Sequence, residues 1–185
     1  MIARLHDTLA RSRANGPGTR MVVWFQGCTL GCAGCFNPAT HAAAGPGTDL
    51  AEVVAAIGRA DVDGLTLSGG EPMQQAPAAL ELLLAARRRG LSTLMFSGYA
   101  RAELGAQALG PAVLAHLDVL VDGRYRADLR HGHGLRGSAN QAIHLLTARH
   151  TLAEVEATPE AEVTIGPDGT IALTGVAPLT IRALR

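Results

Sequence analysis

The chain has 185 residues, of which 48% are apolar, and its 16 basic residues balance 16 acidic residues. This length predicts one domain with enough chain for a substantial core. A net charge of zero argues against nucleic acid or a membrane surface as a partner, because both attract proteins through excess positive charge. Every basic residue is arginine, which excludes mechanisms that depend on a lysine. No apolar stretch is long enough to span a bilayer and no targeting segment is apparent, so we expect a cytoplasmic protein.

The first strong pattern is an apolar run over residues 21–26, which predicts a strand that ends directly before Cys28. A helix is expected to begin near Leu50. Thr48 or Asp49 can cap this helix, and the acidic residue in its first turn suits the helix dipole.

A second helix is predicted to end at Gly90. Its apolar face consists of Ala76, Ala79, Leu80, Leu83 and Leu84. Residues 87–89 are three consecutive arginines. At the last turn of a helix they are expected to form a solvated end that favours the dipole, rather than a nucleic-acid site.

Short strands are predicted over residues 64–68, 92–96, 119–121 and 143–146, with a helical stretch around residues 101–108. The alternation of strand and helix implies parallel strands with helices outside them. The expected fold class is therefore α/β, either a barrel or part of one.

The C-terminal part of the chain has a different pattern. Residues 161–165 and 170–174 predict two strands around a turn at residues 166–169, which is a β-hairpin. Two strands are too few to form a domain. We therefore expect a core over residues 1–150 and an extension over residues 151–185 that packs on the core or covers its mouth.

The three cysteines of the chain, Cys28, Cys32 and Cys35, lie within eight residues. Three thiolates can hold three irons of a 4Fe-4S cluster and leave the fourth iron open, whereas four cysteines would close it. Glycines between the ligands let the backbone wrap closely around an inorganic core. The spacing therefore predicts a catalytic cluster rather than an electron carrier.

Other uses of the three cysteines fit less well. An odd number at tight spacing disfavours disulfides. Structural zinc needs four ligands, and the fourth could only be the nearby His41 or a residue distant in sequence. Three unconnected buried cysteines remain the third alternative.

A second motif, residues 67–72, lies where a strand is predicted to end. Its paired glycines, Gly69 and Gly70, would let a small ligand approach main-chain carbonyls, and these carbonyls together with Glu71 could accept hydrogen bonds from an ammonium group. Paired glycines at a strand end are more often only a turn. The motif gains weight from the cysteines, because active sites of βα folds gather at the carboxyl ends of the strands.

These motifs resemble those of the radical S-adenosylmethionine (SAM) enzymes. The cysteines match the CxxxCxxC signature of that superfamily, and residues 69–72 resemble its GGEP segment. The similarity extends over residues 15–147, and the segments that carry it are Asn15–Arg20, Gly27–Asn37, Ser97–Tyr99, Asp118–Gly123 and Arg136–Gln141. The chain is most similar to the activating enzymes of glycyl-radical enzymes, above all those of anaerobic ribonucleotide reductase.

The resemblance implies a partial (β/α) barrel of the radical SAM type. It also implies a 4Fe-4S cluster whose open iron binds the amino nitrogen and carboxylate of SAM. Such an enzyme cleaves SAM reductively to a 5′-deoxyadenosyl radical, which then removes a hydrogen atom from a glycine of a partner. The implied partners are a glycyl-radical enzyme, such as anaerobic ribonucleotide reductase, and reduced flavodoxin or ferredoxin as the electron donor.

The resemblance also implies which residues hold SAM. The cysteines are the catalytic and metal-binding set, and the expected cofactor-binding residues are Phe36, Asn37, Ser68, Gly69, Gly70, Glu71, Pro72, Ser97, Tyr99, Asp122 and Asn140. Two features depart from the family pattern. The aromatic residue follows Cys35 instead of preceding it, and the predicted hairpin is not part of the minimal activating-enzyme pattern.

Several polar residues have a second interpretation. Asp122 can cap a strand end, and Asn140 and Gln141 can satisfy loop backbone groups. Arg20 can pair with a carboxylate of SAM or of a partner, or with an internal acid. His131 and His133 are more typical of a solvated loop than of a metal site, and residues 124–136 could form a contact surface.

Two further functions remain open beside glycyl-radical activation. The chain could be a stand-alone radical SAM enzyme acting on a small molecule or peptide, with the hairpin closing its site. It could also be a non-catalytic iron-sulfur or zinc-binding module.

Overall fold

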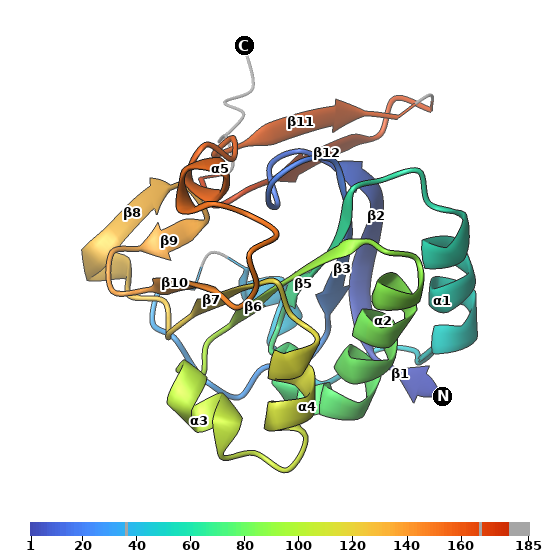
Figure 1. Ribbon diagram of the computed structural model, residues 1–185. Coiled ribbons are helices and arrows are strands. Elements are labelled where there is room, and N and C mark those ends of the chain that lie inside the picture. The colour runs from blue at the N-terminus through green and yellow to red at the C-terminus, as the bar shows by residue number, and fades with distance from the viewer. Residues whose placement is uncertain (36, 167, 178–185) are drawn as a thin grey trace.

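The computed structural model describes residues 1–35, 37–166 and 168–177. Its centre is a six-stranded sheet with the strand order β10-β7-β6-β5-β3-β2 (Figure 1). The inner strands are mutually parallel, and both edge strands run antiparallel to their neighbours. The bounds of the six strands are β2 (Leu5–Ser12), β3 (Arg20–Phe25), β5 (Gly64–Gly69), β6 (Ser92–Ser97), β7 (Val119–Asp122) and β10 (Ala142–Leu145). The chain therefore has a mixed α/β fold with a mostly parallel central sheet.

The strands predicted from apolar runs are confirmed, with one correction of direction. The strand expected over residues 143–146 is β10, which pairs antiparallel with β7. A parallel strand would need a crossover connection, usually an α-helix. Here the connection consists of a short 3-10 turn and the hairpin β8 (Arg130–His133) and β9 (Arg136–Ser138), so the chain returns in the opposite direction.

Helices α1 (Leu50–Arg59) and α2 (Ala76–Arg88) pack on one face of the sheet, with α3 (Arg101–Gly105) and α4 (Gly110–Ala115) beside them (Figure 1). The predicted cap is confirmed for Asp49, whose carboxylate accepts a 3.1 Å hydrogen bond from the Ala51 N–H. Gly90 follows α2 with a φ of +70°, a left-handed conformation that glycine adopts without strain.

The buried face of α2 is shifted from the predicted one. Its fully buried residues include Ala79, Leu82, Leu83 and Ala86, whereas Leu80 and Leu84 are only half-buried. The stretch expected around residues 101–108 forms two short helices instead of one, and α4 begins at Gly110, outside the predicted range. The core consists of apolar side chains between these helices and the inner strands.

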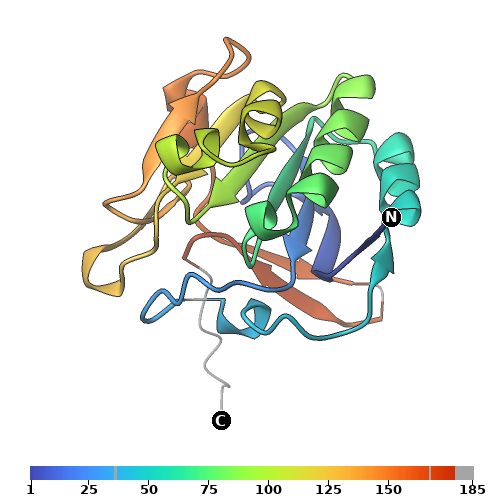
Figure 2. The same cartoon turned by 90° about the horizontal axis from the view of Figure 1, so that it is seen from below.

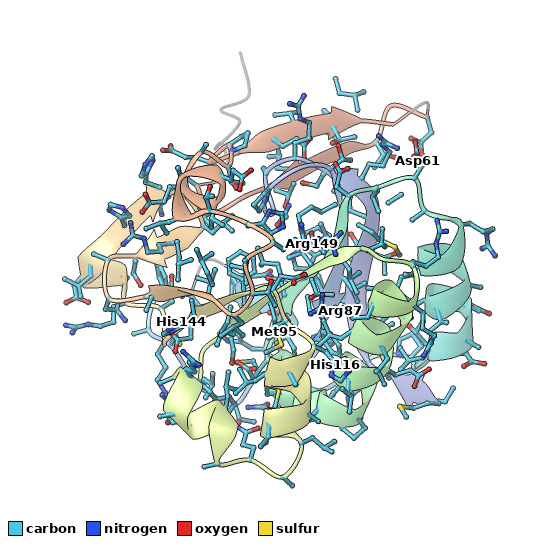
Figure 3. The ribbon with its side chains drawn as sticks, in the orientation of Figure 1. Asp61, Arg87, Met95, His116, His144 and Arg149 are labelled. Carbon is cyan, nitrogen blue, oxygen red and sulfur yellow. The ribbon has the colours of Figure 1, made fainter. Side chains whose placement is uncertain are left out.

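One of the three consecutive arginines is not solvated as expected. Arg87, which Figure 3 labels on α2, lies 3.1 Å from Asp118. The side chain of Asp118 is buried. Burial acts to raise the pKa of Asp118, but hydrogen bonds from Thr147 and Thr93 and the Arg87 charge outweigh it and lower that pKa. Arg88 and Arg89 are exposed, in agreement with the prediction.

Hydrogen bonds to neutral groups, rather than an ion pair with an internal acid, hold Arg20 in the described part of the chain. It lies at the amino end of β3, away from the cysteine loop, and its guanidinium is completely buried. It donates hydrogen bonds to Thr66 Oγ1, Ser92 Oγ and the carbonyls of residues 17, 65 and 92. Burial lowers the pKa of Arg20 to about 10. Its role in the fold is to join the amino ends of three strands.

The opposite face of the sheet carries the C-terminal elements (Figures 1 and 2). These are the β8–β9 hairpin, α5 (Leu152–Glu156) and the predicted C-terminal hairpin, which is present as β11 (Glu162–Ile165) and β12 (Ile171–Thr174). The remaining elements are β1 (Ile2–Ala3), β4 (Thr48–Asp49) and the 3-10 turns Pro38–Thr40, Pro72–Gln75 and Ala127–Leu129. None of the helices in the described part of the chain combines the length and apolar character that a bilayer span requires.

Candidate functional site

A cavity of about 470 Å³ lies on the face of the sheet opposite the helices. Trp24 of β3, Ser68 of β5 and Phe96 of β6 line it. In each strand these residues alternate with core residues such as Val23 and Leu67, because successive side chains point to opposite faces. The cavity therefore lies on the sheet face opposite α1 and α2, which is the face that also carries α5 and the C-terminal hairpin.

The cysteine loop begins where β3 ends, and all three cysteines line the cavity. They are half-buried and form no disulfide. Gly31 and Gly34 have φ values of +63° and +68°, so the loop uses left-handed turns between its ligands. Backbone hydrogen bonds from Gly27 N to Thr40 O (2.7 Å) and from Cys28 N to His41 O (3.0 Å) close the base of the loop.

The three thiols are a donor set that suits a 4Fe-4S cluster, because such a cluster bonds each thiolate to a different iron. Within residues 1–35, 37–166 and 168–177, no group of three His, Cys, Asp or Glu side chains is placed to hold one metal ion. His41, the residue considered as a fourth zinc ligand, lines the same cavity as the cysteines.

The thiol of Cys28 is harder to ionise than an ordinary cysteine. Burial raises the pKa of Cys28, and the negative charges of Glu71 and of the neighbouring cysteines raise it further, while a backbone hydrogen bond at Leu30 lowers it. Thiolates bind metal only after they lose their protons. A positively charged metal centre bound at this site would favour the thiolate.

The two glycines at the end of β5, Gly69 and Gly70, have a packing role in the structure. A Cβ added at Gly69, whose φ is +101°, would lie 2.4 Å from the backbone nitrogen of Phe25, and one added at Gly70 would lie 2.3 Å from the carbonyl oxygen of Gly27. Gly70 N also donates to Phe25 O at 2.7 Å. Close approach of β5 to the start of the cysteine loop therefore requires glycine at both positions.

Glu71 is buried, with 1% of its surface exposed. Its carboxylate accepts hydrogen bonds from Met73 N (3.0 Å), Ser97 Oγ (2.9 Å) and Gly98 N (2.8 Å). Burial raises the pKa of Glu71 from an ordinary 4.5 to about 7, although these three hydrogen bonds act to lower it. The side chain thus ties the end of β5 to the end of β6, and it also borders the cavity.

The structure brings most of the predicted site residues to this cavity. Those that line it are Cys28, Cys32, Cys35, Asn37, Ser68, Gly69, Gly70, Glu71 and Ser97. Pro72, Tyr99, Asp122 and Asn140 are not among the residues that line it. Phe36 lies outside the described residues.

Tyr99 lies outside the cavity and contacts the cysteine loop through Gln74. Its hydroxyl lies 3.4 Å from Gln74 Nε2, and the same nitrogen donates to Thr29 Oγ1 at 2.8 Å. Gln74 also accepts a bond from Thr29 N at 3.1 Å. The guanidinium of Arg124 lies 5.7 Å from the centre of the Tyr99 ring.

Asp122 and Asn140 have local partners. Asp122 accepts a hydrogen bond from Arg101 N, and His144 Nε2 lies 3.1 Å from its Oδ1 without hydrogen-bond alignment. Asn140 donates to the Arg124 carbonyl at 2.9 Å. These contacts match the strand-end and backbone interpretations. Gln141 bonds to Gly123 O at 3.0 Å and borders the cavity.

The histidine pair in the β8–β9 hairpin has a surface role. His131 and His133 meet edge to face at 5.8 Å, and His133 Nδ1 lies 2.8 Å from Glu160 Oε1. They belong to no group of three potential metal ligands among the described residues.

Sequence reasoning missed part of the lining. Trp24, Phe96 and Leu135 supply apolar surface, and Asn15 also lines the cavity. The strand alternation could have placed Trp24 and Phe96 opposite the core. Residues 170–176 of the C-terminal hairpin form a wall, and the sequence analysis expected this hairpin to pack on the core or cover its mouth.

Comparison with known proteins agrees with this site. The chain matches the family model described as "4Fe-4S single cluster domain" over residues 14–144. It therefore carries a domain of the class that holds one 4Fe-4S cluster.

Similar proteins of known name identify the family within this class of 4Fe-4S proteins. The anaerobic ribonucleoside-triphosphate reductase-activating protein of Vibrio cholerae is 35% identical to this chain, and the match covers 72% of this chain and 92% of the relative. The protein of the same name from Escherichia coli K12 is 34% identical, and the match covers 71% of this chain and 92% of the relative. The namesake from enterobacteria phage T4 is 28% identical over 70% of this chain and 85% of its own length. The chain belongs to the family of anaerobic ribonucleoside-triphosphate reductase-activating proteins.

Proposed function

We propose that this protein is a radical SAM enzyme that installs a glycyl radical on an anaerobic ribonucleotide reductase. The observation that carries the proposal is that the only three cysteines of the chain line one cavity together with Gly69, Gly70 and Glu71. The names of the relatives supply the partner. The four parallel strands that end at this site would form the partial (β/α) barrel of the radical SAM type.

Cys28, Cys32 and Cys35 would hold three irons of a 4Fe-4S cluster and leave the fourth for the amino nitrogen and carboxylate of SAM. When bound, the cluster supplies one electron that splits SAM into methionine and a 5′-deoxyadenosyl radical, which takes a hydrogen atom from the partner's glycine and becomes 5′-deoxyadenosine. A reduced flavodoxin or ferredoxin would provide the electron. Three unpaired, half-buried cysteines and a reduced cluster would suit the reducing cytoplasm.

The chain itself positions SAM and excludes water. The carbonyls after β5 and the outward side of the Glu71 carboxylate would accept hydrogen bonds from the methionine ammonium, with Ser68, Ser97 and Asn37 as further polar neighbours. Trp24, Phe96 and Leu135 give the cavity an apolar interior that protects a reactive radical from solvent. No single residue in this set is assigned a proton-transfer step, because hydrogen-atom abstraction needs none.

The test is anaerobic reconstitution with iron and sulfide, followed by incubation with SAM, a chemical reductant and the reductase from the same source. Electron paramagnetic resonance should show a persistent glycine-centred doublet on the reductase. Cys32→Ala should give no doublet while retaining its circular dichroism spectrum. Reconstituted protein that cleaves SAM but leaves the reductase without a radical contradicts the proposed partner.

A second function has one specific observation in its favour. The C-terminal hairpin walls the cavity, which suits a stand-alone radical SAM enzyme acting on a small molecule or peptide. Steady production of 5′-deoxyadenosine with such a substrate, and no radical on the reductase, would select this alternative.

A further inference from the structure

The C-terminal hairpin meets the cavity along the edge of β12. Seven consecutive residues, 170–176, border the cavity. A strand that turned one face to a cavity would line it with alternate residues, because successive side chains point to opposite sides. An unbroken run of lining residues means that the backbone edge of the strand borders the space.

The hairpin register shows which backbone groups lie on that edge. Gly166 N donates to Thr170 O at 2.7 Å, so residues 166 and 170 form a hydrogen-bonded pair. Hydrogen-bonded and non-hydrogen-bonded pairs alternate along an antiparallel ladder. The next pair, Ile165 with Ile171, and the pair Val163 with Leu173 are therefore non-hydrogen-bonded.

In non-hydrogen-bonded pairs the N–H and C=O groups point away from the partner strand. The backbone groups of Ile171 and Leu173 thus point to the outer edge of β12. In the described part of the chain, β12 pairs only with β11. This edge is a template for one more strand.

Polar contacts fix the hairpin to the core at one end. Glu162 accepts hydrogen bonds from Ser12 Oγ (2.6 Å) and Arg13 N (3.0 Å), and Asn15 Nδ2 donates to Thr174 Oγ1 at 2.8 Å. Asn15 itself lines the cavity. The edge of β12 is therefore held beside the cavity that contains the cysteines.

We propose that the edge of β12 binds an extended polypeptide segment of the partner by β-strand addition within the cavity. The inference rests on the proposed function, since it identifies the substrate as polypeptide backbone rather than a small molecule. Main-chain donors and acceptors at strand spacing match an extended peptide. Ile171 and Leu173, which are 54% and 38% exposed, provide apolar contacts for its alternate side chains.

This contact is a feature of the chain beyond the matched family region. The family model ends at residue 144, and β12 begins at Ile171. The cysteine site and the peptide-binding edge therefore lie in separate segments of sequence and meet only in the cavity. The hairpin selects the polypeptide that reaches the site.

The experiment combines hydrogen exchange with two proline variants of the full chain. Leu173→Pro removes an N–H from the edge of β12 without removing a ladder hydrogen bond. Val163→Pro, its cross-strand neighbour, makes the same change on the far edge of β11, which does not border the cavity. Affinity for the purified reductase is measured anaerobically for both variants and for the unmodified protein.

On binding the reductase, exchange of the Ile171 and Leu173 amides should slow by at least about tenfold. Leu173→Pro should weaken binding by roughly 3- to 10-fold, the loss expected for one hydrogen bond, and Val163→Pro should leave it unchanged. The exchange measurement uses the unmodified protein, so it tests strand addition at β12 even if a proline variant fails to fold.

Equal effects of the two prolines, or binding without protection of these amides, overturn the strand-addition proposal. If the reductase still acquires its glycyl radical in that case, the proposed function stands and only the edge assignment fails. If the reductase neither binds nor acquires a radical, both proposals fail.

Discussion

Ser97 Oγ donates a 2.9 Å hydrogen bond to Glu71 Oε1, and this bond joins the carboxyl ends of the parallel strands β5 and β6 beside the cavity. Both residues are buried, so loss of this bond leaves the Glu71 carboxylate with fewer hydrogen-bond donors from the protein. The geometry gives Glu71 a positioning role that is separate from any contact with SAM.

At pH 8 or above, where the Glu71 carboxylate is ionised, Ser97→Ala should destabilise the protein by about 1.5–3 kcal/mol, because it removes a hydrogen bond to a buried charged group. Urea unfolding of the metal-free protein measures the change. The double variant Ser97→Ala/Glu71→Gln should lose less than the sum of the single variants, since both disrupt one network. Strict additivity would show that the two side chains do not act on each other.

The raised pKa of Glu71 predicts a pH-dependent stability. The group titrates at about 7 in the folded protein and at its ordinary 4.5 in the unfolded chain, so between these values the folded state holds the extra proton. Unfolding free energy should therefore fall as pH rises from about 5 to about 7, with a slope of at most about 1.4 kcal/mol per pH unit. It should then level off above the folded pKa.

Glu71→Gln is the control for this effect, because the amide cannot ionise. Subtracting its unfolding free energy from that of the unmodified protein at each pH should isolate the falling slope. A difference that rises with pH over the same interval would mean that the folded protein favours the ionised carboxylate.

The sequence predicted those parts of the fold that local chemistry determines. The apolar runs around Leu65 and Val121 are buried on both faces, so their strands could be recognised without knowledge of neighbours. The edge strand β2 was missed because most of its residues are exposed and its apolar pattern is weak. The direction of β10 depended on the connection before it rather than on its own residues.

In the functional site, too, some features follow from local sequence and others depend on contacts between distant segments. The spacing of the three cysteines predicted that they act together, and all three line the cavity. Asp122 and Tyr99 were assigned to SAM from the family resemblance, yet polar residues at or just after a strand end can turn toward a cavity or toward neighbouring backbone. In this protein both make neighbouring contacts. The hairpin wall depends on packing between segments 150 residues apart, such as Ser12 and Glu162.

Arg87→Met should destabilise the protein by about 1–2 kcal/mol, because it leaves the buried Asp118 carboxylate without its 3.1 Å cationic partner. The loss is smaller than for a fully buried pair, since Arg87 is partly exposed and Thr93 and Thr147 still donate to Asp118. Arg88→Met, one residue further along α2, is the control and should change stability by less than about 0.5 kcal/mol. Similar losses for both variants would mean that helix-end charge, and not the Asp118 pair, is responsible.

Gly70→Ala should reduce cluster loading of the reconstituted protein. The added methyl group would lie 2.3 Å from Gly27 O and 3.0 Å from Thr40 O, so the base of the cysteine loop must move. Iron and sulfide content per chain, together with the visible absorbance of the cluster, measures the loss.

Gly58→Ala is the matched control, because a methyl group there meets no atom within 4 Å and Gly58 lies inside α1. That control should load normally and gain roughly 0.5–1 kcal/mol of stability from better helix propensity. Normal loading of Gly70→Ala would show that the loop accommodates the displacement and that contact with Gly27 does not position the cysteines.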